Sequence, residues 1–139
     1  MIELRLPWAP STNTIWRSMR SGPMAGRVLL SKAGREFFAQ AEREVLVQRA
    51  GRRIAGRAQV EIVLHAPTRA QLDIDNRAKA VLDACTKGGL WADDSQVDVL
   101  IVRRACVLKG GAVLVRAIEI EAAPEQAELA IREREPEFF

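Results

Sequence analysis

The chain has 139 residues, of which 48% are hydrophobic, and this length and apolar content predict a single domain with its own core. No stretch approaches the roughly 20 apolar residues of a membrane span, and no basic patch precedes an apolar run at the N-terminus, so we expect a cytoplasmic protein. Cys85, Cys106 and the single histidine, His65, lack the spacing of a disulfide framework or a zinc site, so a metal ion would have to be bound by oxygen ligands.

The N-terminal segment predicts a strand followed by a long loop. Residues 2–7 alternate in polarity, as in a half-buried strand. Residues 8–27 are rich in turn-forming and basic residues and predict a loop of the length that often carries function. A short strand is expected at 28–31.

A helix is expected from Lys32 to about Ala50, with Ser31 as its N-cap and Gly51 at its end. Its hydrophobic residues recur at helical spacing and should face the core: Phe37, Phe38, Ala41, Val45 and Leu46. Residues 58–67 then predict a second strand.

The second half of the domain predicts another helix and a pair of strands. From Asn76 to Thr86 the apolar residues Ala78, Val81, Leu82 and Cys85 recur as on a buried helix face, and Asp75, Lys79 and Asp83 fall on the opposite side. Residues 97–109 and 112–122, joined by two glycines, predict a β-hairpin with strands long enough for the centre of a sheet. We therefore expect one α+β domain over residues 1–122 and a charged C-terminal extension over 123–139.

Negative charge is concentrated in part of this basic chain. Residues 73–98 hold six aspartates against three basic residues, and residues 123–139 hold five glutamates against two arginines. Each of these segments has a net charge of −3, whereas the rest of the chain has a net charge of +9. A basic surface suits a polyanion such as nucleic acid, although it serves solubility equally well.

The spacing of the aspartates indicates a cation site. Crowded carboxylates repel one another unless a cation lies between them, and Mg²⁺ is typically bound by one or two carboxylates plus a substrate phosphate. Asp73 and Asp75 lie two residues apart in an extended segment, so they project to the same side and can hold one ion. Asp93 and Asp94 would point to opposite faces of an extended segment, so only one can join them, and periodicity does not show which.

Each of these features also has a structural alternative. Asp73 or Asp75 would serve equally well as a cap for the helix that follows. Asp83 and Lys79 would form an ordinary surface ion pair, and residues 92–96 a solvated turn.

A larger pattern resembles a known family. The segment DIDNRAKAVLDACTKGGLWADDSQV, residues 73–97, resembles the signature of the RusA-type Holliday junction resolvases, endodeoxyribonucleases often encoded by phages and prophages. The segment LPWAPSTN, residues 6–13, matches that family's loop after the first strand, and the resemblance covers most of residues 3–121 in order. It implies a homodimer with a mixed β-sheet flanked by two main helices, which acts on four-way DNA junctions in DNA recombination and repair.

The resemblance also implies roles for individual residues. Asp73, Asp75 and Asp94 would bind Mg²⁺, with Mn²⁺ as a substitute, and Lys79 would be an essential basic partner. The resemblance thereby selects Asp94 over Asp93 as the third ligand. Supporting roles fall to Asn76, Asp83 and Asp93, with Asp83 orienting Lys79. We expect a water activated by the ion to attack a backbone phosphate while Lys79 neutralises the developing charge, leaving a 5′-phosphate and a 3′-hydroxyl.

Asn13 and four basic residues in or beside the long loop are candidate DNA contacts, with an ordinary solvated surface as the alternative for the basic ones: Arg17, Arg20, Arg27 and Lys32. Trp91 is expected in the core, whereas Trp8 and Trp16 fit either a core or a base-stacking role.

Two other functions compete with junction cleavage. A non-catalytic DNA-junction or single-strand binder gains nothing from anions where phosphate must lie, and a magnesium-dependent hydrolase of small phosphorylated substrates leaves the basic surface unused.

Overall fold

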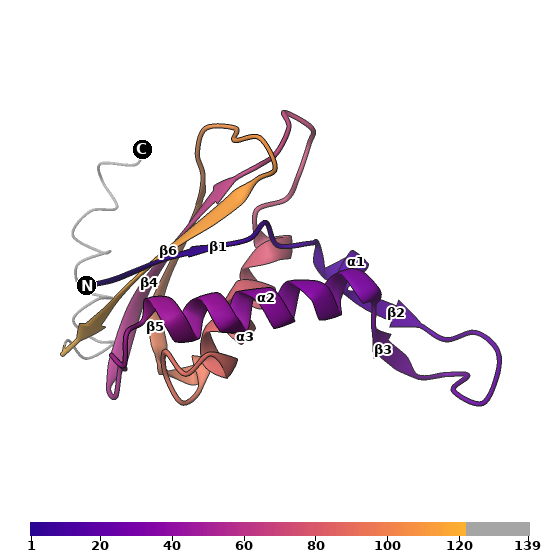
Figure 1. Cartoon of the computed structure of the whole chain (residues 1–139), viewed down its shortest axis with the longest axis horizontal. Coiled ribbons are helices and arrows are strands. Elements are labelled where there is room, and N and C mark those ends of the chain that lie inside the picture. The colour runs from indigo at the N-terminus through magenta and orange to yellow at the C-terminus, as the bar shows by residue number, and fades with distance from the viewer. Residues whose placement is uncertain (122–139) are drawn as a thin grey trace, which may run out of the picture.

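The computed structural model describes residues 1–121 as a four-stranded sheet, a separate two-stranded hairpin, two long helices and two short ones (Figure 1). In chain order the elements are β1 (Ile2–Leu6), α1 (Thr12–Ile15), β2 (Trp16–Ser18), β3 (Val28–Leu30), α2 (Lys32–Gln48), β4 (Arg57–His65), α3 (Asp75–Lys87), the 3₁₀ helix η1 (Asp94–Gln96), β5 (Val97–Arg104) and β6 (Ala112–Ile120). The predicted single α+β domain with a mixed sheet is confirmed. The expected extension at 123–139 lies outside the described residues.

The order of the main sheet is β1-β6-β4-β5. Strand β5 runs parallel to β4, and β6 runs antiparallel to both β4 and β1. The prediction of a hairpin from the last two strands is therefore wrong, because β4 lies between them. Helix α3 returns the chain so that β5 enters beside β4 in the same direction, as in other crossover connections. The chain then crosses the end of β4, where the amide of Ala105 donates to the carbonyl of Leu64 at 3.0 Å.

The core lies between the helices and one face of the main sheet. Strand β1 alternates buried and exposed residues, and its buried Leu4 joins residues of α2 and α3 in one hydrophobic cluster. Helix α2 buries Phe37, Phe38, Ala41 and Val45 as predicted, but Leu46 is 56% exposed, so that part of the prediction is wrong. Position 46 is rotated by about 100° from Val45 around the helix axis, which turns it away from the core.

Both helix ends predicted for α2 are close to the structure. The hydroxyl of Ser31 accepts a hydrogen bond from the amide of Gly34 at 3.0 Å, which confirms it as the N-cap. The helix ends at Gln48, two residues before the predicted end at Ala50.

Residues 8–27 are not the continuous loop that we expected. They contain α1, which Ser11 caps by accepting from the amide of Thr14 at 3.3 Å, and strand β2. Strands β2 and β3 pair antiparallel, and the hairpin of residues 16–30, called the β2–β3 arm below, projects from the body of the molecule (Figure 1). Gly22 and Gly26 adopt φ values of 84° and 83° in its turn, a conformation that favours glycine.

Among the described residues 1–121, no helix combines the length and the apolar character required to cross a membrane.

Candidate active site

Helix α3 presents the acidic residues of the sequence motif. Its N-cap is Ile74, whose side chain makes no capping hydrogen bond, so neither Asp73 nor Asp75 occupies the capping position that we considered as an alternative. Asp75 instead lies in the first turn, where a carboxylate interacts favourably with the helix dipole. Both aspartates are exposed, which leaves their carboxylates accessible to solvent or to a ligand.

Lys79 contacts two carboxylates, and its ion pair with Asp94 joins α3 to η1. Its Nζ lies 2.9 Å from Asp83 Oδ1, one turn further along the helix, and 2.7 Å from Asp94 Oδ2. The hydrogen bond from Lys79 lowers the pKa of Asp94, and the hydrogen bonds to Asp94 and then Asp83 raise the pKa of Lys79. Lys79 is therefore firmly cationic at neutral pH, although 64% of its side chain is exposed.

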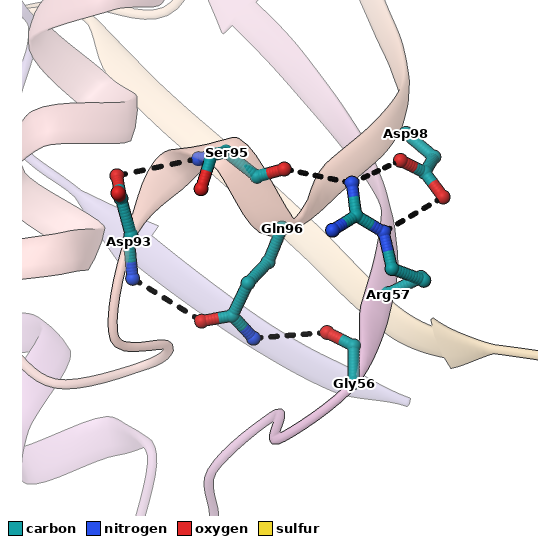
Figure 2. A network of polar contacts seen from close by, with 6 residues as sticks. All are labelled: Gly56, Arg57, Asp93, Ser95, Gln96 and Asp98. Carbon is teal, nitrogen blue, oxygen red and sulfur yellow. Dashed lines mark hydrogen bonds and ion pairs between the residues drawn. The ribbon is translucent and has the colours of Figure 1, made fainter.

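The neighbours Asp93 and Asp94 have different structural roles. Asp93 is the N-cap of η1, and its Oδ1 accepts a hydrogen bond from the amide of Ser95 at 3.3 Å (Figure 2). The side chain of Gln96 accepts from the amide of Asp93 at 3.2 Å and so completes a capping box. Asp93 thus shapes the backbone, while Asp94 extends toward α3.

A polar network fixes η1 against β4. Gln96 Nε2 donates to the carbonyls of Ile54 and Gly56, both at 2.9 Å. Arg57 donates to both carboxylate oxygens of Asp98 and to the carbonyl of Ser95, at 2.7 Å for the latter (Figure 2). Its guanidinium lowers the pKa of Asp98. Asp98 therefore belongs to the support of the site rather than to the α3 surface.

The backbone that carries Asp73 and Asp75 is held from two sides. Arg104, at the end of β5, donates from Nη2 to the carbonyl of Leu72 at 2.6 Å. On the other side, the hydroxyl of Thr12 in α1 donates to the carbonyl of Asn76 at 2.8 Å. The acidic segment is thereby fixed between the end of the sheet and the start of the β2–β3 arm.

Arg77 supplies a further link to the N-terminal segment. Its guanidinium lies 4.7 Å from the ring centroid of Trp8 and donates to the carbonyl of Ala9. Partial burial lowers the pKa of Arg77. A Cβ added to Gly111 would lie 2.8 Å from Trp8 Cγ, so a glycine is required where the turn before β6 approaches the indole.

The structural residues around the site were only partly foreseen. Gln96, Arg57, Arg77 and Arg104 were missed, although an aspartate followed three residues later by glutamine is a recognisable capping-box pattern. Trp91 is fully buried and donates from Nε1 to the hydroxyl of Thr86 at 2.7 Å, which confirms its place in the core.

The donor chemistry of the site suits a hard divalent cation. Asp73, Asp75 and Asp94 supply oxygen donors only, and Mg²⁺ needs no more than one or two carboxylates when a phosphate completes its coordination. Within residues 1–121, however, no three side chains of histidine, cysteine, aspartate or glutamate lie close enough together to hold one ion. The structure thus joins Asp94 to Lys79 and Asp83, and does not gather the three predicted ligands into one cluster.

The candidate DNA contacts all come from residues 13–32, in α1, the β2–β3 arm and the start of α2. Asn13 is exposed on α1, and Arg17, Arg20 and Arg27 are exposed on the β2–β3 arm. Lys32 opens α2, where its Nζ lies 3.9 Å from Glu36 Oε1. The sequence contains no acidic residue between Glu3 and Glu36, so every charged side chain within residues 4–35 is basic.

Comparison with known proteins shows the family of this chain. The family model described as Endodeoxyribonuclease RusA matches residues 7–120. The chain belongs to the RusA endodeoxyribonuclease family. Among its relatives, the crossover junction endodeoxyribonuclease RusA of Escherichia coli (strain K12) is 34% identical over 109 residues, which cover 78% of this chain and 87% of the relative. The protein of the same name from Enterobacteria phage 82 gives the same identity and coverage. The RusA protein of Escherichia coli O139:H28 is 32% identical over 118 residues, which cover 85% of this chain and 94% of the relative.

Proposed function

We propose that this chain is a Mg²⁺-dependent endonuclease that resolves four-way (Holliday) DNA junctions in recombination and repair. The observation that carries the proposal is Lys79 held between Asp83 and Asp94 on the exposed side of α3, one turn after Asp75. A cation fixed among carboxylates at a basic surface suits the cleavage of a phosphodiester. Its relatives named crossover junction endodeoxyribonuclease support a branched DNA substrate.

The metal-binding residues that we propose are Asp73, Asp75 and Asp94, with Mn²⁺ able to replace Mg²⁺. When bound, the ion supplies Lewis-acid activation of the attacking water and of the scissile phosphate. The exposed carboxylates of Asp73 and Asp75 would hold the ion at the start of α3. The links from Arg104 to Leu72 and from Thr12 to Asn76 restrict this segment, which favours a fixed spacing of the two ligands.

Lys79 acts on the phosphate in this proposal. A lysine is protonated at neutral pH, and Asp94 and Asp83 raise the pKa of Lys79 further, so its ammonium can neutralise negative charge that builds on the phosphoryl oxygens. Asp83 keeps the ammonium on the side of α3 that faces η1. Hydrolysis with the 3′ oxygen as the leaving group leaves a 5′-phosphate and a 3′-hydroxyl.

Paired cleavage calls for two copies of the site. A four-way junction has two symmetry-related strands to cut, whereas one chain carries a single α3 acidic surface. We therefore propose a homodimer with two-fold symmetry, the commonest closed assembly, which would introduce two symmetric nicks.

A cleavage assay on end-labelled DNA tests the function. Four-way junctions, flaps and linear duplexes of matched sequence would be incubated with the protein in Mg²⁺, and parallel samples would contain EDTA. We expect junctions to be nicked and linear duplexes to be spared, with no cleavage in EDTA. Tight junction binding without cleavage in Mg²⁺ or Mn²⁺ would instead support a non-catalytic junction binder.

A further inference from the structure

Trp16 is the most exposed of the three tryptophans. Trp91 is fully buried and Trp8 packs against the core, whereas 48% of the surface of Trp16 is exposed. On the β2–β3 arm Trp16 pairs with Leu30, which itself packs against the core. The indole of Trp16 therefore offers a large apolar surface to solvent on an element that projects from the body (Figure 1).

The base of the arm is fixed close to the acidic site. Trp16 directly follows α1, and α1 is tied to α3 by the hydrogen bond from Thr12 to the carbonyl of Asn76 at 2.8 Å. On the returning strand, the amide of Ser31 donates to the carbonyl of Ile15 at 2.7 Å. Trp16 thus stands at the anchored end of the arm, directly after α1, which contacts α3.

The rest of the arm is suited to the DNA backbone. Residues 16–30 carry Arg17, Arg20 and Arg27 and no acidic side chain. All three arginines are exposed, and the space around Gly22 and Gly26 in the turn is open. Arginines of this kind bind phosphates of any DNA and give no preference for a branched substrate.

We propose that Trp16 stacks on a base face left unstacked at the branch point, so that the arm gives the protein its preference for branched over linear DNA. This inference rests on the proposed junction cleavage. Bases inside a linear duplex are already stacked on both faces, whereas a branch point offers a free base face to an aromatic ring. The arginines then strengthen binding to every DNA, and Trp16 adds affinity only where such a base exists.

Binding measurements on the 139-residue chain separate these contributions. The probes are a four-way junction with 2-aminopurine beside the branch point and a linear duplex of the same arm sequence, both in Ca²⁺ to limit cleavage. We expect Trp16→Ala to weaken junction binding about tenfold or more while duplex binding changes far less. Trp16→Phe, which keeps an aromatic face, should retain most of the selectivity.

Two control variants define the readout. Val28→Ala removes another apolar side chain of the arm, one that is 60% exposed, and should preserve the junction-to-duplex ratio. Arg27→Ala should weaken binding to both DNAs alike and reduce the slope of log affinity against log salt by about 1. Wild-type protein and Trp16→Phe should change the 2-aminopurine fluorescence, and Trp16→Ala should not.

The possible outcomes distinguish this inference from the proposed function. If the wild-type protein prefers junctions and Trp16→Ala keeps that preference, the stacking role is wrong and the proposed function stands. The same holds if Trp16→Phe loses as much selectivity as Trp16→Ala. A wild-type protein that binds junctions no better than duplexes would contradict both.

Discussion

Replacing Lys79 by alanine removes one cation from between two carboxylates and separates a catalytic role from a structural one. Nζ lies 2.9 Å from Asp83 and 2.7 Å from Asp94, but 64% of the lysine side chain is exposed. Exposed ion pairs contribute about 0.2–1 kcal/mol each, so the loss of two should lower the free energy of unfolding by less than about 2 kcal/mol. Removing a donor that stabilises transition-state charge should instead slow cleavage by roughly 10²-fold or more.

The assay is single-turnover cleavage of a four-way junction in Mg²⁺, with binding measured separately in Ca²⁺ and stability by urea unfolding. We expect Lys79→Ala to fold, to bind junctions and to cleave poorly. Lys79→Arg should also cleave poorly, because a planar guanidinium keeps the charge without reproducing a compact ammonium aimed at one oxygen. A cleavage rate for Lys79→Ala within a few-fold of wild type would refute the reasoning and leave Lys79 as a surface residue.

Four further predictions follow from the site and its support. Asp94→Asn should abolish cleavage with junction binding intact or tighter, whereas Asp93→Asn should reduce cleavage less, because asparagine caps a helix as well as aspartate. Nick quantification measures cleavage and gel-shift titration measures binding, and a greater loss of cleavage in Asp93→Asn than in Asp94→Asn would contradict the assignment. The pKa of Asp94 is lowered in the folded state, so the contribution of its carboxylate to stability is complete above the ordinary aspartate pKa of about 3.9 and is lost as the pH falls further. The difference in unfolding free energy between wild type and Asp94→Asn, measured by urea unfolding, should therefore shrink at low pH. Gly88→Ala should lower the free energy of unfolding by about 1–3 kcal/mol, because the added Cβ would lie 2.5 Å from Val45 Cβ where α3 meets α2. A variant as stable as wild type in urea unfolding would show that the helices readjust. Light scattering should give twice the chain mass, and a monomer that persists on junction DNA would exclude the proposed dimer.

The two long helices, α2 and α3, were predictable because local signals agreed with tertiary packing. In α3 the apolar spacing and Gly88 predicted both the buried face and the end, and Lys79 and Asp83 fell together on the exposed side. The strand pairing was not predictable in the same way. Two glycines between apolar runs favour a hairpin locally, but the crossover through α3 places β5 beside β4, and this long-range pairing leaves no local signature.

The site shows the same division between local and long-range information. The alternation of Asp93 and Asp94 predicted that only one of them joins the site if the segment is extended. Asp94 instead begins the 3₁₀ helix η1, and only the capping box shows that Asp93 is the one that shapes the backbone. The links from Arg104 to Leu72 and from Arg77 to Ala9 join residues 32 and 68 positions apart, respectively, so spacing alone did not reveal them. In the arm, the strand predicted at 28–31 is observed as β3, whereas its partner β2, only three residues long, was missed.

The most direct test of the central claim is to map the nicks on a four-way junction labelled in turn on each of its four strands, comparing wild type with Asp94→Asn in Mg²⁺. We expect nicks at symmetry-related positions on two opposing strands, with religatable ends that carry a 5′-phosphate and a 3′-hydroxyl, and no nicks from Asp94→Asn. Nicks on a single strand, or equal cleavage by wild type and Asp94→Asn, would contradict it.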